Sequence, residues 1–172
     1  MGKLDITLTT MARTAAEAHG LVLVCARLMS GKRQTLEVLL ENADGTSPLL
    51  DTCAAVSKQL ARALDETDPI KGRYTLEVGS AGLTRPLLSP ADYKRFSGRH
   101  ARLSFGAPQM VRDLLVGAVS GTLSKPTDTD VTVVMDGHAE TFPYSVIRSA
   151  ELSPTKLELA AFTKSVSKPT AN

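Results

Sequence analysis

The sequence predicts an α+β protein in which a three-stranded sheet with two helices precedes a small β-barrel. In the first half, apolar residues recur at helical spacing in two segments and alternate with polar residues in two others. After Gly98 the chain changes to short β segments separated by Pro, Gly and Asp turns. We therefore expect two domains of different architecture.

The first half begins with a predicted helix and a predicted hairpin. Apolar residues at helical spacing open the chain: Leu4, Leu8, Met11, Ala15 and Ala18. Gly20 stands where a helix commonly ends. The Leu- and Val-rich segment 21–29 and the alternating segment 34–41 flank Ser30-Gly31-Lys32-Arg33, which predicts a β-hairpin with a polar tip.

A second helix and a third strand complete the predicted N-terminal sheet. Ser47 as N-cap and Pro48 in the first turn predict the start of this helix. Its apolar stripe is Leu49, Cys53, Val56, Leu60 and Leu64. Tyr74 to Val78 alternates in the manner of a half-buried strand. The order of elements predicts a sheet with both helices on one face.

The second half predicts a short helix and a barrel. Ser89-Pro90-Ala91-Asp92 has the cap, first-turn Pro and acidic third position of a helix start. Asp136-Gly137 indicates a tight turn, and Gly117 and Gly121 are interpreted as points where the sheet curves. A break at Tyr144-Ser145-Val146 precedes the last strand, which is typical of a closed SH3-like or Sm-like barrel. The expected strands are 99–105, 116–124, 131–135, 139–142 and 147–152.

These patterns give four segments. We expect an N-terminal α/β domain at 1–86, a linker with a short helix at 87–98, an Sm-like β-barrel at 99–152, and a flexible tail at 153–172.

Composition narrows the classes of function. Of the 172 residues, 42% are hydrophobic and 4% aromatic, so the cores must be built from aliphatic side chains. The net charge of +2 argues against binding nucleic acid mainly by neutralising phosphates, which needs a strong basic surplus. Because the sequence has neither a membrane-spanning apolar run nor a signal pattern, we expect a cytoplasmic protein. Without an exposed heptad run, a monomer is the expected state.

The segment from Gly79 to Pro86 is the leading candidate for a binding element. Gly79-Ser80-Ala81-Gly82 carries little side-chain bulk, so its backbone can adopt positive φ or approach another surface closely. Arg85 is held against Pro86, and a guanidinium on a stiff segment suits a planar anionic partner. The alternative is that this segment is merely a tight interdomain connection.

Several segments, taken together, resemble the bacterial ribosome maturation factor family RimP. Leu-Asp-Glu-Thr-Asp-Pro-Ile at 64–70, Tyr-Thr-Leu-Glu-Val at 74–78 and Gly-Leu-Thr-Arg-Pro-Leu at 82–87 carry the resemblance, and 50–57 and 93–99 fit in order and spacing. The family turn usually reads Val-Ser-Ser-Pro-Gly, whereas this chain has Val-Gly-Ser-Ala-Gly at 78–82. Without the Ser and the Pro, we expect a less rigid turn.

The resemblance implies the same C-terminal barrel and a non-enzymatic assembly factor for the small (30S) ribosomal subunit, which binds the immature particle transiently. It implies a small-subunit ribosomal protein as a direct partner, and ribosomal RNA is a further candidate. A basic cluster of Lys94, Arg95, Arg99 and Arg102, with Arg85 upstream, could meet such a partner or could be ordinary solvated charge. The candidate partner-binding residues are Glu77, Ser80, Gly82, Arg85, Pro86, Arg95 and Arg99.

No catalytic, cofactor-binding or metal-binding residue is predicted. The segment around Ser80 resembles a nucleophile elbow but has Val78 where the first Gly is required. His138-Ala139-Glu140 lacks the Pro-Cys-x-x-Cys of a zinc deaminase, and the His and Cys residues have no ligand spacing. Two rival functions remain: a general RNA-binding Sm-like module and a small hydrolase that uses Ser80.

Overall fold

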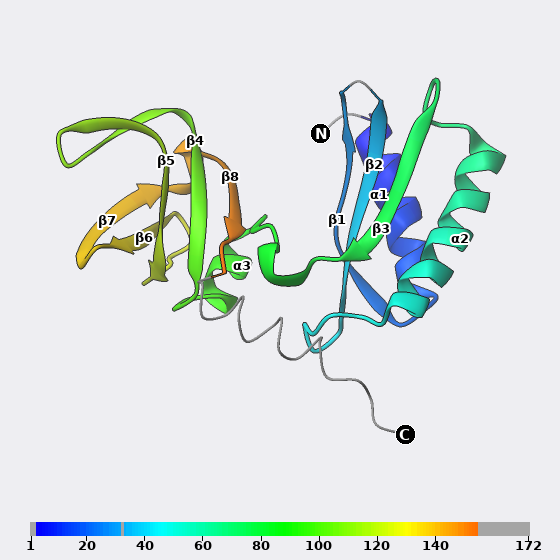
Figure 1. Ribbon diagram of the computed structural model, residues 1–172, viewed down its shortest axis with the longest axis horizontal. Helices are drawn as coiled ribbons and strands as arrows, with labels where there is room; N and C mark the ends of the chain where they lie inside the picture. Colours follow the sequence, from blue (N-terminus) through cyan, green and yellow to red (C-terminus); the bar gives the residue numbers. More distant parts are fainter. Residues whose placement is uncertain (1–2, 32, 155–172) are drawn as a thin grey trace. The chain divides into compact units, whose positions relative to one another are not determined.

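The computed structural model describes residues 3–31 and 33–154. The chain divides into two compact units, of which the first ends at Gly82 and the second begins at Leu83 (Figure 1). Each unit has its own hydrophobic core. From residue 155 onward, the tail expected at 153–172 lies outside the described residues, as does Lys32 of the polar hairpin tip. Among the described helices, none is long and apolar enough to cross a membrane.

The first unit is a three-stranded sheet with two helices. Its elements are α1 (Lys3–Glu17), β1 (Leu21–Met29), β2 (Gln34–Asn42), α2 (Leu50–Thr67) and β3 (Tyr74–Ser80). The strand order is β1-β2-β3, with β1 antiparallel and β3 parallel to β2. Parallel pairing of consecutive strands needs a crossover, and α2 supplies it. The prediction of both helices on one face is confirmed (Figure 1).

Alternation along β2 sets the core of the first unit. Leu36, Val38 and Leu40 are fully buried and pack with residues of both helices. The intervening Glu37 and Leu39 are half-buried and lie on the opposite face of the sheet. The sheet therefore has one face covered by helices and one open face.

The predicted start of α2 at Ser47 and Pro48 is wrong. The helix begins at Leu50, and its N-cap residue Leu49 makes no side-chain capping bond. The Ser47 hydroxyl instead accepts a hydrogen bond from Ser80 Oγ at 3.0 Å, and its carbonyl accepts one from Asn42 Nδ2 at 3.2 Å. These bonds hold Ser47 in the loop beside the sheet. Leu49, which was expected in the apolar stripe, precedes the helix and is 77% exposed, and Leu50 at the first helical position is 83% exposed.

Strand β3 is longer than its alternating segment predicted. Gly79 pairs with Leu39 and Ser80 pairs with Leu40, so both residues continue the ladder with β2. Positive φ, at 56°, occurs only at Gly82 within the segment expected to form the turn. Gly82 begins the short 3-10 helix η1 (Gly82–Thr84). The low-bulk segment is thus half strand and half turn.

The second unit is a five-stranded antiparallel sheet with a short helix. Its elements are α3 (Pro90–Arg95), β4 (His100–Val111), β5 (Leu114–Ser124), β6 (Asp130–Met135), β7 (His138–Pro143), the 3-10 helix η2 (Tyr144–Val146) and β8 (Ile147–Leu152). The strand order is β7-β6-β5-β4-β8. Within the residues that the structure describes, β7 and β8 do not pair, so the sheet is not closed into the predicted barrel.

The predicted helix start and the predicted tight turn in this unit are both confirmed. Ser89 and Asp92 form both halves of a capping box at the start of α3. Asp136 and Gly137 take φ values of 48° and 80°, the left-handed conformation that a tight hairpin between β6 and β7 requires.

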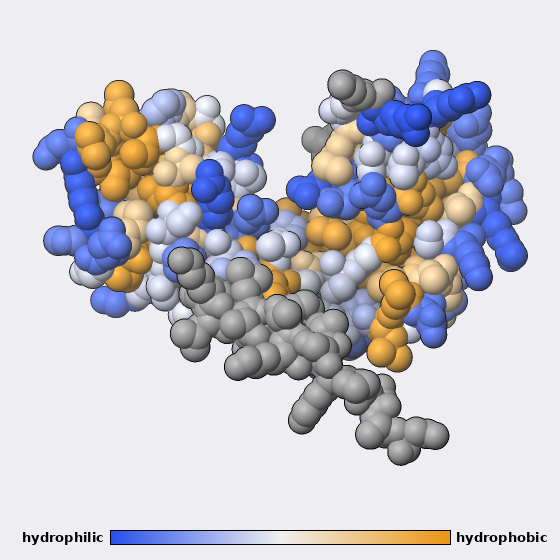
Figure 2. Space-filling view, in the orientation of Figure 1, coloured by the Kyte–Doolittle hydropathy of each residue, from blue (hydrophilic) through white to orange (hydrophobic). Residues whose placement is uncertain are grey.

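The β4–β5 hairpin extends well beyond the predicted strands. A register shift between Ser104 and Gln109 interrupts the pairing, which then resumes up to Val111 and Leu114. Apolar side chains gather toward the hairpin tip (Figure 2), where Met110, Leu114 and Leu115 are 63%, 67% and 69% exposed. The alternating pattern fails at Gly106-Ala107-Pro108, which is why the sequence did not predict this extension.

Candidate functional site

The candidate residues of the first unit lie at the end of β3. The Ser80 hydroxyl donates a hydrogen bond to Ser47 Oγ at 3.0 Å and accepts one from the N–H of Gly82 at 3.1 Å. These two bonds tie the strand end to the loop before α2 and to the turn that follows. Ser80 therefore contributes to the conformation of the segment that carries Gly82.

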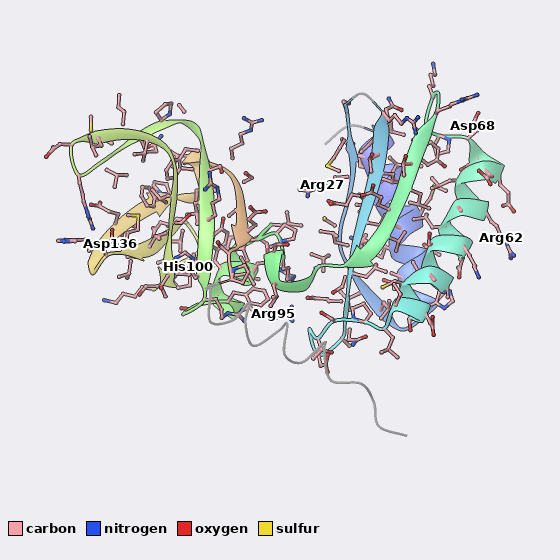
Figure 3. The ribbon with its side chains drawn as sticks, viewed as in Figure 1. Arg27, Arg62, Asp68, Arg95, His100 and Asp136 are labelled. Carbon is pink, nitrogen blue, oxygen red and sulfur yellow. The ribbon has the colours of Figure 1, made fainter. Side chains whose placement is uncertain are left out.

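Glu77 lies at the end of a row of charges on the open face of the sheet. Arg27 of β1 is opposite Glu37 of β2, and these two side chains form an ion pair. Glu37 is in turn opposite Glu77 of β3. Figure 3 shows Arg27 on the side of the sheet away from α2. Among the described residues, Glu77 has no hydrogen-bond or ion-pair partner, so the row ends in an exposed carboxylate at the edge of the sheet.

Arg85 of the second unit is buried and engaged in internal contacts. Its residue is 8% exposed, and Nη1 donates to Asp92 Oδ1 at 2.8 Å and to the carbonyl of Pro86 at 3.1 Å. Its guanidinium also lies 5.0 Å from the centre of the Phe96 ring. The Arg85 carbonyl accepts the N–H of Leu152 at the end of β8. Arg85 thus joins the entry segment of this unit to α3 and to the sheet.

Asp92 is the shared acceptor of this arrangement. Besides Arg85, its carboxylate accepts the N–H groups of Leu88 and Ser89 at 3.0 Å and 2.9 Å and the Ser89 hydroxyl at 2.9 Å. Burial by itself would raise the pKa of Asp92, but the hydrogen bonds from Leu88, Arg85 and Ser89 outweigh it and lower the pKa below 3.8. The carboxylate is therefore held ionised beside Arg85.

Phe96 brings the candidate arginines together. The Arg95 guanidinium lies 5.0 Å from the ring centre, the same distance as that of Arg85, and the Arg99 N–H donates to the Phe96 carbonyl at 3.0 Å. Arg95 is exposed (Figure 3) and Arg99 is half-buried. We call Arg85, Arg95, Phe96 and Arg99 the Phe96 cluster. It presents Arg95 and part of Arg99 to solvent.

The remaining basic residues near α3 lie outside the Phe96 cluster. Lys94 forms an exposed ion pair with Asp128 at 2.7 Å. Arg102 is opposite Glu151 of β8 in the β4–β8 pairing. Pro86, another candidate residue, makes an isolated bridge with the same Glu151. Of the predicted basic cluster, Lys94 is therefore paired with an acid and Arg102 lies on β4, whereas Arg85, Arg95 and Arg99 contact Phe96.

Helix α3 is fixed to the core by two tyrosines. The ring centres of Tyr93 and Tyr144 are 4.7 Å apart, and the Tyr144 hydroxyl donates to the Thr127 carbonyl at 3.2 Å. Burial, together with Tyr144 and Asp92, raises the pKa of Tyr93 to about 12. This packing positions the Phe96 cluster at the end of α3.

Sequence reasoning identified Asp92 only as part of a helix start and gave Phe96 no role in the site. Ser89-x-x-Asp92 is a capping box, and that motif signals only a helix start. Asp92 also pairs with Arg85, and this pairing depends on how the chain turns between residues 85 and 92. The sequence did contain one signal for this pairing. Arg85 precedes Asp92 by seven residues, and Asp92 lies in the first turn of the predicted helix, so the two opposite charges are expected near the same helix end.

Among the described residues, no group of three or more His, Cys, Asp and Glu could hold a metal ion. Residues 11–84 match the RimP N-terminal domain family. The match covers the second half of α1, the whole sheet of the first unit, α2 and η1, and so includes the candidate residues Glu77, Ser80 and Gly82. Residues 11–84 of this chain therefore form a domain of the RimP N-terminal family.

Proposed function

We propose that this chain is a non-enzymatic maturation factor for the small (30S) ribosomal subunit that binds the immature particle transiently. The match of residues 11–84 to the RimP N-terminal domain carries this proposal. Binding alone can promote maturation, because a ligand that favours one conformation of a precursor raises the population of that conformation. The proposed partners are a small-subunit ribosomal protein and ribosomal RNA, met by a monomer in the cytoplasm.

We further propose that the second unit is an open variant of an Sm-like or SH3-like barrel. Its strand order places the last strand, β8, against the first, β4. A one-turn 3-10 helix, η2, precedes β8, at the break that the sequence predicted. At Gly121, β6 passes close over β5, which supports strong curvature of the sheet.

The placement of the aromatic side chains supports this proposal over a general RNA-binding module. Sequence-tolerant binding of single strands relies on exposed aromatic rings that stack on bases. Tyr93, Phe105 and Phe142 are only 4%, 6% and 4% exposed, and Phe105 and Phe142 pack on each other with ring centres 4.9 Å apart. Phe96 is covered by two guanidinium groups. These rings contribute to packing within the second unit.

Depletion of the protein from its cells tests the proposed function. We expect sucrose gradients to show accumulated free small subunits that contain unprocessed precursor rRNA, with recovery when the unaltered chain is supplied. The expected cause is slower conversion of precursor particles that lack the stabilising ligand. A normal gradient and normal rRNA processing in depleted cells would contradict the proposal.

Charge reversal at Arg95 tests the contribution of the Phe96 cluster. Arg95 is exposed, so Arg95→Glu is expected to weaken binding to immature small subunits about threefold to tenfold with unchanged folding, since charges at the rim of an interface act mainly through long-range attraction. The effect should shrink as salt is raised. Arg62→Glu, at an exposed position of α2 (Figure 3), is the matched control. Equal affinity of the two variants would exclude a role of Arg95 in binding.

A further inference from the structure

Strand β3 is the last strand of its sheet, and one of its edges is open. In the order β1-β2-β3, β3 pairs with β2, and no other strand lies against it within residues 3–31 and 33–154. An open edge presents backbone N–H and C=O groups that can pair with an added strand.

The hydrogen bonds to β2 show which groups of β3 face that open edge. Ala81 donates its N–H to the Leu40 carbonyl at 2.9 Å and so extends the ladder. Successive residues of a strand direct their backbone groups to opposite sides, so Glu77 and Gly79 face β2 as Ala81 does. Leu76 and Val78 therefore direct their N–H and C=O groups to the open edge.

A groove follows this edge between β3 and α2. Near the start of the helix it has a volume of about 450 Å³, and its apolar lining includes Leu50, Cys53, Ala54, Leu76 and Val78. A second hollow of about 820 Å³ lies at the start of β3, where its lining is Tyr74, Thr75 and Leu76 together with Asp65 of α2 and Gly31, Arg33, Gln34, Gly72 and Arg73. The groove thus lies beside Leu76 to Gly79, and the second hollow lies at the start of the strand, which leaves room for a short extended segment beside β3.

The exposure of neighbouring core residues supports an accessible edge. Leu36 and Val38 of β2 are fully buried, whereas Leu76 and Val78, their partners on β3, are only half-buried. Leu50, on the helix side of the groove, is 83% exposed. An apolar side chain placed in the groove would cover all three of these partly exposed residues.

The charges of the groove favour a basic side chain beside Glu77, whereas Arg33, Arg73 and Asp65 line the hollow at the start of β3. The groove near the start of α2 is lined by Glu37 and Glu77 and by no Lys or Arg. Arg27 compensates Glu37, whereas Glu77 faces the edge without a partner among the described residues. A strand added beside β3 would place one of its side chains next to Glu77, and opposite charges stabilise such a cross-strand pair.

We propose that β3 accepts an extended basic polypeptide segment as a fourth strand of this sheet. A Lys or Arg of the segment lies beside Glu77 on the open face, and an apolar residue fills the groove against α2. A second copy of this chain is disfavoured, because two β3 edges paired antiparallel about Glu77 would bring these carboxylates together. RNA phosphates would face the same carboxylates. Identifying the segment as part of a ribosomal protein rests on the proposed function, whereas the strand addition does not.

Peptide titration of the full chain tests the proposal. The probe is an acetylated and amidated Lys-Val-Lys-Val-Lys peptide, compared with Glu-Val-Glu-Val-Glu. We expect the Lys peptide to shift the amide resonances of β3 and to slow hydrogen exchange at Leu76 and Val78 at least tenfold. Exchange at Glu77 should change little, because its N–H already faces β2. This alternation distinguishes strand pairing from a contact made by side chains alone.

Two variants separate the backbone pairing from the charge. Val78→Pro removes one outward N–H without removing a bond to β2, and should abolish Lys-peptide binding. Glu77→Lys should weaken Lys-peptide binding about fivefold and strengthen binding of the Glu peptide. Glu66→Lys, at an exposed position near the end of α2, is the matched control and should bind as the unaltered chain does.

Several results would overturn the proposal. They are the absence of protection at Leu76 and Val78, equal binding of both peptides, or an unchanged preference in the Glu77→Lys variant. Concentration-dependent protection of β3 without peptide would assign the edge to a second copy, and the same protection by oligouridine would assign it to RNA. The peptide assay uses only purified chain and peptide, so a negative result would reject strand addition at β3. The proposed role in ribosome maturation is tested independently by the depletion experiment.

Discussion

Replacing Gly121 by Ala is expected to destabilise the second unit by roughly 3 kcal/mol or more, since overpacking a tight core site typically costs about 1 to 3 kcal/mol when soft side chains can yield. At this site the nearest atom is backbone. A Cβ on Gly121 would lie 2.5 Å from the Val134 carbonyl oxygen, 2.7 Å from Val133 Cγ1 and 2.8 Å from Met135 Cγ. Relief of that contact would require β6 to move away from β5. Hydrogen exchange of β4 and β5 amides measures the loss.

Gly117 provides the matched control on the same strand. It lies four residues before Gly121, and a Cβ there would meet no atom within 4 Å. Gly117→Ala should therefore leave stability unchanged or raise it slightly, because Ala restricts the unfolded chain more than Gly does. Equal exchange rates in the two variants would contradict the close approach of β6. The comparison also tests whether Gly117 and Gly121 have different roles, because from the sequence both were interpreted in the same way, as points where the sheet curves.

Much of the fold could be predicted from periodicity alone. The stripe from Cys53 to Leu64 and the alternation in β2 identify the faces that pack together, because each face follows from local spacing. The β4–β5 extension could not be predicted in this way. Its turn uses Arg112 and Asp113 at φ values of 48° and 62°, without a glycine, and Arg112 Nη2 donates to the Met135 carbonyl at 2.6 Å. That stabilising contact joins residues far apart in the sequence.

The candidate site was less predictable, because it depends on tertiary pairing. Arg85 was interpreted as a binding residue because Pro86 restricts its backbone, and a stiff guanidinium suits an anion. The structure provides that anion internally in Asp92. Arg95 and Arg99, which have the same charge, remain more accessible than Arg85. The sequence shows that Arg85 is positively charged, but the fold determines which acidic group pairs with it.

Neutralising Asp92 is the second change with a large expected effect. Asp92→Asn keeps the size of the side chain but removes the charge that faces Arg85, whose side chain is only 10% exposed. Removing one member of a buried ion pair commonly costs about 3 to 5 kcal/mol. Asp92 is itself 15% exposed, so we expect roughly 3 kcal/mol at neutral pH, a value at the lower end of that range. The midpoint of thermal unfolding of this unit should fall by more than 10 °C, since each kcal/mol shifts it by about 4–8 °C.

The same variant predicts a change in acid stability. The pKa of Asp92 in the folded unit is lowered below 3.8, so its contribution to stability is complete above its ordinary pKa and is lost as pH falls through the folded value. The difference in unfolding free energy between Asp92→Asn and the unaltered chain should be constant above about pH 5 and should narrow below pH 4. Urea unfolding followed by methyl resonances of the second unit, at pH values from 7 to 3, measures this difference.

Two further variants decide whether the charge pair or the helix cap is responsible. Arg85→Met together with Asp92→Asn removes both charges, and this double variant should be more stable than Asp92→Asn alone, which leaves Arg85 buried without its counter-ion. Asp128→Asn, which breaks the exposed pair with Lys94, should show no measurable loss, because exposed pairs contribute little. If the double variant were instead the less stable, Arg85 would stabilise this unit mainly through its other contacts, such as those with Pro86 and Phe96, and not through the charge of Asp92.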